Sequence, residues 1–280
     1  MMQKDKNSEG EIVIHHKRGR LSYRTTIQRH LITIIFVAAC SVAFGFLALH
    51  FAYPHNAFNI NNVSFGIILL ATLNSFTRLL VAYFCAVIIS IPLALFIVST
   101  PQVQRIMLPI ADVAQSVPVL AFFPVIVALF ISSGNFEIAA IFILITIMIW
   151  NLVFPAIQGL QTIPEDIESA AIVFNVHGFF KKLWNITLPS IFPFLVVGSL
   201  EAWAQGWTTL IVAEVLHTYI PNGNLSQDLL GIGSLLVDST VESKTAIFVI
   251  TLTVMILLIS LLNLFVWQKL IRLSQRFKFD

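Results

Sequence analysis

Three acidic side chains inside long apolar stretches are the residues of this sequence best placed to do chemistry. They are Asp112, Glu201 and Glu214. A carboxylate at membrane depth is costly, so it is usually retained for contact with a solute or ion, or for proton transfer. Glu201 also has polar neighbours within the next two turns of a helix, namely Gln205, Trp207 and Thr208. We therefore take Glu201 and these neighbours as candidates for the wall of a polar pathway.

The three carboxylates suit different roles. Glu214 follows an Ile-Val-Ala run, which favours a structural role in holding helices together or shaping an outer gate. Asp112 is expected near the end of a membrane span, where it would face lipid headgroups. Glu201 is the better candidate for a cavity wall. There it would repel an anionic solute and favour a neutral or cationic one.

Patterns typical of enzymes or metal sites are incomplete here. Glu214 and His217 make one E-x-x-H, but a di-iron carboxylate site needs two copies and two further Glu. The pair His15 and His16 lies in a basic tail and is more typical of a solvated segment. The run 231–233 lacks the third glycine of a dinucleotide loop, which predicts a turn outside the membrane. No H-E-x-x-H or G-x-S-x-G run occurs, so we expect no enzyme activity, metal or cofactor.

The composition shows which solvent surrounds these residues. Of 280 residues, 58% are hydrophobic and 11% are charged, and the mean hydropathy is +0.89. A soluble domain carries about 25% charged residues, so lipid must surround most of this chain. The same figures exclude disorder. Cys40 and Cys85 both lie in apolar runs, where a thiol behaves as a small hydrophobe, so no disulfide scaffold is indicated.

Six stretches are long enough to cross the membrane, which takes about 20 apolar residues. They cover approximately residues 31–51, 76–99, 106–131, 136–160, 188–216 and 245–267. The predicted fold class is all-α, a polytopic membrane protein with six transmembrane helices. We expect a basic tail at residues 1–30 and a transmembrane domain at residues 31–280, with its core at about 70–270.

The basic residues predict the orientation. With six spans both ends of the chain share one side, and 14 of the 16 Lys and Arg fall on that side. The other two, Arg78 and Lys244, are expected near span ends on the opposite side. The positive-inside rule then places both termini in the cytoplasm. A basic tail beside a span typically fixes topology, so nucleic acid is not the expected partner.

Proline is concentrated at membrane depth. A proline in a helix frees a backbone carbonyl, which is tolerated only where neighbouring helices or a water-lined cavity satisfy it. The densest cluster begins at Ser116 and Pro118 and continues to Pro124. We add Ser116 and Pro118 to the pathway candidates, and Glu214 stays among them.

The segment 162–187 between the fourth and fifth spans differs from its surroundings. Thr162 with Glu165 three residues later forms a capping box, and Pro164 suits a first helical turn. Residues 179–184 suggest a second short amphipathic helix before a span that opens at Leu188 and Pro189. Acidic residues near 165–168 argue against a helix lying on anionic lipid. A protein partner on the cytoplasmic side fits better.

These residues resemble a known motif. The run 164–171, Pro-Glu-Asp-Ile-Glu-Ser-Ala-Ala, with Ile-Thr-Leu-Pro at 186–189, resembles the EAA loop of permease subunits of bacterial ABC importers. Residues 115–118 and 122–124, Trp150 with Asn151, and the runs 211–214, 231–234 and 275–277 look like the branch with nitrate, sulfonate and taurine permeases. The resemblance covers roughly residues 70–280. One departure is Val176, which stands where the family usually has its loop glycine, with Gly178 two residues later.

The resemblance implies a function and partners. The chain would form half of a pathway for a small solute, a nitrate-, sulfonate- or taurine-like anion. Its loop would be a coupling helix gripped by an ATPase dimer that binds the ATP, since this chain has no P-loop. A second permease subunit and a solute-binding protein would complete the assembly in the lipid bilayer. The residues implied in coupling are Glu165, Glu168, Ala170, Ala171, Val176, Gly178 and Pro189.

Two other classes stay open from the sequence alone. An ion-coupled secondary transporter would use Asp112, Glu201 or Glu214 as its proton or cation site. Many such carriers have inverted repeats, and none is visible here. A membrane-embedded enzyme has only scattered His and Glu in its favour.

Overall fold

A computed structural model gives the fold of the second part of the chain. It describes residues 63–131, 135–164, 166–167, 178–219 and 228–277. All of these belong to the unit formed by residues 49–280. The basic tail and the first predicted span, 31–51, lie outside the described residues, as do residues 165 and 168–177 of the loop 162–187.

The described part is helical, and no strand occurs in it. The main elements are α2 (Phe65–Ile97), α3 (Pro101–Ser116), α4 (Phe123–Ile131), α5 (Phe136–Gln161), α7 (Phe179–Lys182), α8 (Leu188–Glu214), α9 (Ile232–Val241), α10 (Thr245–Leu262) and α11 (Gln268–Ser274). Four helices in the described ranges are long and apolar enough to span a membrane, and a bent pair would make a fifth. The all-α polytopic class is confirmed, and the number six stays a prediction.

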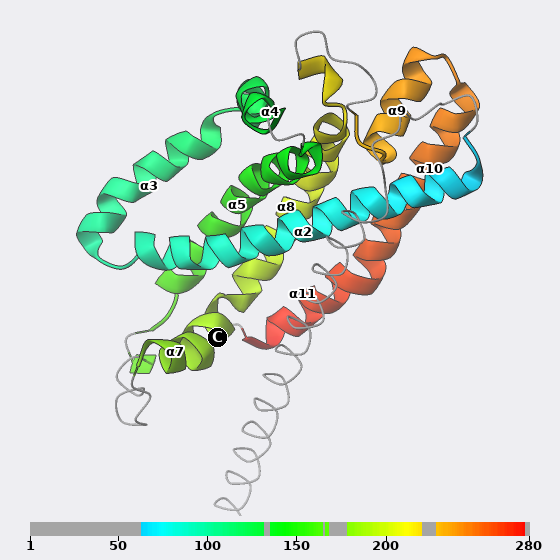
Figure 1. Ribbon diagram of the computed structural model, residues 1–280. Helices are drawn as coiled ribbons and strands as arrows, with labels where there is room; N and C mark the ends of the chain where they lie inside the picture. The colour runs from blue at the N-terminus through cyan, green and yellow to red at the C-terminus, as the bar shows by residue number, and fades with distance from the viewer. Residues whose placement is uncertain (1–62, 132–134, 165, 168–177, 220–227, 278–280) are drawn as a thin grey trace, which may run out of the picture. The chain divides into compact units, whose positions relative to one another are not determined.

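The core lies where α5 and α8 pack side by side, with α2 packed along α5 (Figure 1). Small residues on α8 let the backbones approach closely. A side chain at Gly198 would collide with the carbonyl of Asn151, and one at Gly206 would collide with Met148 and Leu79. Met148 and Leu79 are both fully buried. This close packing makes α5 and α8 the frame on which the other helices are placed.

The third predicted span is broken, which corrects the expectation of one helix over 106–131. The helix α3 ends at Ser116, and the next turn, Val119–Phe122, opens a helix bent by 78° from α3. Val117 has φ −76° and ψ 123°, which is the extended conformation that a following proline imposes on its neighbour. Pro118 therefore ends α3 at this point.

The second predicted span was placed too far along the chain. It begins at Phe65 rather than near residue 76, so Arg78 lies well inside α2. Arg78 is 1% exposed, not a charge at a span end. The first turns of α2 contain polar residues that are buried here, including Thr72, Asn74 and Ser75. These polar residues lower the local hydropathy, so the sequence predicted a later start for this helix.

The second short helix predicted before span five is the start of that span. Residues 179–214 run as one long helix, with a π-helical turn at Leu183–Thr187 between α7 and α8. Pro189 explains this turn. A proline ring clashes with the carbonyl four residues earlier, and a wider π turn relieves such a clash. Residues 179–187 therefore belong to the long helix, and the segment between the two spans is shorter than the predicted loop 162–187.

The segment between the fifth and sixth predicted spans contains a helix that was not predicted. This helix, α9, packs against α2, α8 and α10. Gly231 is the residue before its first turn and is buried, so the run 231–233 is the buried start of a helix and not a turn, and its place outside the membrane stays a prediction. Span six begins at Thr245 as predicted and continues through a π turn at Asn263–Trp267 to Phe277.

Candidate functional site

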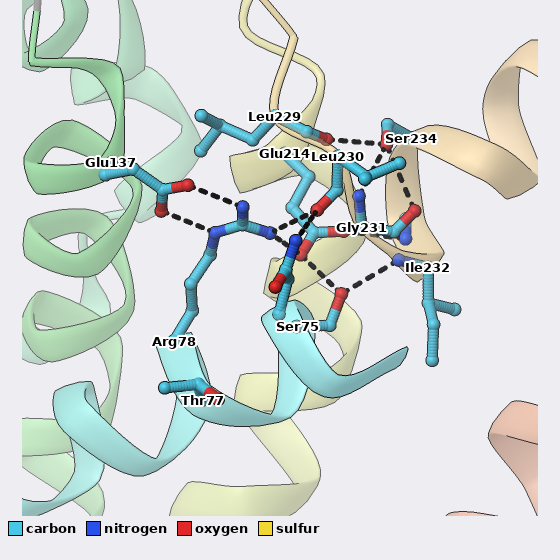
Figure 2. A network of polar contacts seen from close by, with 12 residues as sticks. Ser75, Thr77, Arg78, Glu137, Glu214, Leu229, Leu230, Gly231, Ile232 and Ser234 are labelled. Atoms are coloured by element: carbon cyan, nitrogen blue, oxygen red, sulfur yellow. Dashed lines mark hydrogen bonds and ion pairs between the residues drawn. The ribbon is translucent and has the colours of Figure 1, made fainter. Parts of the chain in front are cut away.

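A network of polar contacts surrounds the guanidinium of Arg78, which lies between two carboxylates from other helices (Figure 2). Its Nε donates to Glu137 Oε2 at 2.6 Å, and its Nη2 donates to Glu137 Oε1 at 2.7 Å. Its Nη1 donates to Glu214 Oε1 at 2.7 Å. Two-point pairing with a carboxylate is the strongest and most directional contact that arginine makes. Arg78 of α2 is thereby tied to both α5 and α8.

Glu214, the last residue of α8, has no exposed surface. Its carboxylate accepts hydrogen bonds from three donors on two other helices: Ser75 Oγ at 2.6 Å and Arg78 Nη1 at 2.7 Å on α2, and the Gly233 amide at 2.7 Å on α9. A buried charge is tolerated only when it is paired and its remaining lone pairs are satisfied. Both conditions hold for Glu214, so this side chain joins α2, α8 and α9.

The start of α9 completes the network. Ser75 Oγ accepts from the Ile232 amide at 2.8 Å while it donates to Glu214. The Leu230 carbonyl accepts from Arg78 Nη1 at 3.1 Å and from Asn74 Nδ2 at 3.3 Å. The first amides of a helix have no partner within the helix and carry partial positive charge, so a carboxylate is favoured there. We call Asn74, Ser75, Arg78, Glu137, Glu214 and residues 230–233 the arginine cluster.

Two glycines make room for this carboxylate. A side chain at Gly231 would overlap the carboxylate of Glu214, and one at Gly233 would meet both Glu214 and the backbone of Ile211. Gly231 has φ −160°, which any residue adopts. The need for glycine at 231 therefore comes from space and not from backbone conformation.

Glu214 was a candidate from the sequence, but its partners Arg78 and Ser75 were missed, as was Glu137, the second acid that pairs with Arg78. A signal was present, since Arg78 is the single charged residue of the 33-residue helix α2. A lone arginine inside a span needs a carboxylate partner. Several acids were available for that role, and nothing in the spacing shows that Glu137 and Glu214, on two other helices, are the ones that meet Arg78.

The candidates on α8 divide between two faces of that helix. Glu201, Gln205 and Thr208 are exposed, and their spacing of four and three residues places them on one face. Trp207 is 5% exposed and contacts Trp203, with ring centroids 6.3 Å apart. Trp207 therefore belongs to the packed interior, and its proposed place on the pathway wall is not supported by its burial.

The remaining pathway candidates lie at the break between α3 and α4. Ser116 is exposed, and its Oγ donates to the Asp112 carbonyl at 2.8 Å. Asp112 is also exposed and accepts from Gln115 Nε2 at 3.1 Å. Pro118 is exposed and opens the short turn that follows. Within the described ranges no hydrogen bond joins Ser116 to the polar face of α8.

Two of the predicted coupling residues are described. Gly178 precedes α7 with φ +96°, a left-handed conformation that glycine adopts readily and other residues rarely do. Pro189 lies in the first turn of α8. Thr162, predicted as the N-cap of a coupling helix, donates from Oγ1 to the Gly159 carbonyl at 2.9 Å at the end of α5. Glu165, Glu168, Ala170, Ala171 and Val176 lie outside the described residues.

A second polar group lies between α8 and α9. The His217 amide donates to Asp228 Oδ1 at 2.9 Å, and His217 Nδ1 lies 2.6 Å from Asp228 Oδ2. Glu214 and His217 thus have different partners, so their E-x-x-H spacing does not form a shared site. Within the described ranges no three His, Cys, Asp or Glu residues are grouped so as to hold a metal ion.

Asp238 of α9, near this group, makes the stability sensitive to pH. Burial raises its pKa from 3.8 to about 6, the carboxylates of Asp228 and Glu242 add to the rise, and His217 opposes it. Because the folded protein binds this proton more tightly, the stabilisation is fully present below about pH 4 and is lost as the pH rises through 6. We expect Asp238→Asn to flatten the dependence of melting temperature on pH between 4 and 6. An unchanged slope in detergent melting curves would contradict this assignment.

Comparison with known proteins identifies the family to which these helices belong. Residues 86–272 match the family described as binding-protein-dependent transport system inner membrane component. The chain belongs to this family. The matched range contains α5, α8 and α9, and it therefore includes Glu137, Glu214 and Gly231. Ser75 and Arg78 precede it, so the arginine cluster joins the family domain to a helix that begins outside the matched range.

Named members of this transport family align with about half of the chain. The nitrate import permease protein NrtB of Leptolyngbya laminosa is 30% identical over 57% of this chain and 56% of its own. The taurine transport system permease protein TauC of Escherichia coli K12 is 28% identical over 51% and 50%. The bicarbonate transport system permease protein CmpB of Synechococcus elongatus is 25% identical over 53% and 52%. The chain spans about half the length of these relatives.

Proposed function

We propose that this chain is the membrane-spanning permease subunit of an ATP-driven importer of the ABC class. The observation that carries the proposal is the family match over residues 86–272, which includes the helices α5 and α8 at the core and the segment between them. Several helices of the described part are long and apolar enough to cross a membrane. The chain has no P-loop, so the ATP would be bound by a separate ATPase subunit.

The segment 162–187 would couple the two subunits. It joins the end of α5 to the start of the long helix 179–214, so a force applied to it reaches both helices of the core. Gly178, with its positive φ, lies where the segment enters that helix. A Cβ atom added to Gly178 would have no atom of the described residues within 4 Å. We expect an ATPase dimer to hold this segment through Glu165, Glu168, Ala170 and Ala171.

The orientation follows from the charges. With Arg78 buried, 14 of the other 15 Lys and Arg belong to the side predicted to carry both termini and the segment 162–187. The positive-inside rule makes that side the cytoplasm. The opposite side would then carry α9 and the His217–Asp228 pair, and a solute-binding protein would deliver solute there.

A second permease subunit would complete the pathway. Glu201, Gln205 and Thr208 form a polar face on a spanning helix, and such a face is too costly to meet lipid. A pathway between two permease subunits would instead provide water and a polar solute. The relatives are named for nitrate, taurine and bicarbonate, which supports a small polar solute for this chain as well.

The ion-coupled carrier is the weaker alternative. Glu214 was one of its candidate ion sites, but Ser75, Arg78 and the Gly233 amide already occupy this carboxylate. A site filled by three donors has no place for a cation. The family match also points to a transporter that works with a binding protein.

Co-purification with the ATPase tests the proposed function. We expect Ala171→Arg to reduce ATPase recovered with the tagged chain at least about tenfold, because a long charged side chain would occupy the docking surface. Val241→Arg is a matched control, because Val241 is 78% exposed at the opposite end of the helices. If both variants retain the ATPase, or if the parent chain never binds one, the proposal is wrong.

A further inference from the structure

The exposed face of α8 carries an acidic residue whose charge nothing in the described ranges balances. Glu201 lies well inside the long helix 179–214, thirteen residues before its end. It is exposed and makes no hydrogen bond or ion pair with any described residue. Glu137 and Glu214 are different, because both pair with Arg78.

The neighbours of Glu201 on this face are polar or small. Gln205 and Thr208 follow at the spacing of successive helical turns. Ala204, which lies between Glu201 and Gln205 in the chain, is also exposed. Thr208 uses its hydroxyl proton on the Gln205 carbonyl at 2.8 Å, and its oxygen remains free to accept. The Gln205 side chain makes no hydrogen bond with any described residue. The face therefore offers a carboxylate, an amide and a hydroxyl oxygen in a row along the helix.

We infer that Glu201, Gln205 and Thr208 form a binding site for a positively charged nitrogen on the transported solute. This inference rests on the proposed permease function and adds the chemical class of the solute. A carboxylate inside a span requires a positive partner or remains very costly, and no described residue supplies one to Glu201. An amine or a zwitterion such as taurine supplies that partner. Nitrate and bicarbonate do not, because the carboxylate would repel them.

Of the solutes for which the relatives are named, taurine suits this face and the simple anions do not. Taurine carries a cationic nitrogen and an anionic sulfonate, so it satisfies a carboxylate on one wall of a pathway. A site for a simple anion would instead present Arg, Lys or helix amides to the solute. Arg78, the buried cation of α2, is already paired with two carboxylates and is 1% exposed. Arg78 is the one Lys or Arg in α2, α5 and α8, so these three helices offer no unpaired cation.

Charged thiol reagents can measure the charge on this face without knowledge of the natural solute. Ala204→Cys places a reporter three residues from Glu201, about 6 Å away on the same face, in a chain whose Cys40 and Cys85 are replaced by Ser. The assembled transporter in proteoliposomes is treated with the trimethylammonium or the sulfonate form of an ethyl methanethiosulfonate. The rate ratio, cation over anion, is then compared with the ratio after Glu201→Gln is added.

We expect Glu201→Gln to lower this ratio at least about tenfold, since one charge at such a distance attracts one reagent and repels the other. Glu201→Asp keeps the charge and should keep the ratio within about threefold. An unchanged ratio after Glu201→Gln would overturn the inference. So would a reporter that reacts only after the protein is denatured, because the face would then be closed to water.

The same samples also test the proposed permease function, with a separate measurement. In an importer, ATP with vanadate should change the rate of both reagents, because the pathway opens to alternate sides. A charge effect without any response to ATP would leave the cation site standing and contradict the ATP-driven function. A response to ATP without a charge effect would support the ATP-driven function and overturn the cation site.

Discussion

Replacing Arg78 with methionine is expected to lower the free energy of unfolding by about 3–5 kcal/mol, because it leaves Glu214 as a buried charge without its cation. Methionine fills much of the volume of the arginine stem, so the effect reports the charge and not a cavity. Glu137 also loses both of its contacts with Arg78. Unfolding is measured by titrating the purified chain with SDS in mixed micelles, with tryptophan fluorescence as the readout.

Two comparisons make this result specific. Arg105→Met removes an exposed arginine of α3 and should change the unfolding free energy by less than about 0.5 kcal/mol. Combining Arg78→Met with Glu214→Gln removes the stranded charge, so the double variant should be more stable than Arg78→Met alone. If Arg78→Met unfolds like Arg105→Met, the arginine cluster does not hold the helices together.

The spans that the sequence predicted well are those whose signal is local. The fourth and fifth spans, and the start of the sixth at Thr245, follow directly from runs of apolar residues. The start of α2 was predicted too late because Asn74 and Ser75, two polar residues buried there, are satisfied by partners more than 130 positions away, Leu230 and Glu214. Hydropathy averages each residue with its sequence neighbours, so it does not detect a partner at that distance.

The errors at prolines have a related cause. Pro118 was placed inside a single predicted span, 106–131, and the chain instead turns by 78° beside it. Pro189 was interpreted as the opening of a span, and the helix instead continues through it with a π turn. A proline always removes a donor and restricts its neighbour, but whether the helix ends or widens depends on what can pack against it.

Glu201 and Glu214 show how far residue type alone can predict a role. Both are acids of the same helix, thirteen positions apart, and both were pathway candidates, although the run before Glu214 favoured a structural role for it. The structure buries Glu214 among three donors and leaves Glu201 on an exposed polar face. Glu214 thus joins helices, as the sequence favoured. Its partners on α2 and α9 are distant or unmarked in the sequence, so only the three-dimensional arrangement identifies them.

Gly231→Ala is expected to cost about 2–4 kcal/mol of unfolding free energy, although it adds only one methyl group. The new carbon would overlap the Glu214 carboxylate, which Ser75, Arg78 and the Gly233 amide hold in place. Overpacking alone costs about 1–3 kcal/mol, and here relief of the overlap also breaks charged hydrogen bonds. The same SDS titration measures the loss.

Gly66→Ala is the matched control for this substitution. At Gly66 the added carbon would have Ser64 Oγ as its nearest neighbour, at 3.7 Å, and alanine favours a helix, so we expect no loss of stability. Because the extended backbone at Gly231 suits alanine, a loss there must come from the carboxylate. Shortening that acid with Glu214→Asp should then recover part of the loss in the double variant. If Gly231→Ala is as stable as Gly66→Ala, the carboxylate does not lie against the start of α9, and the account of the arginine cluster fails.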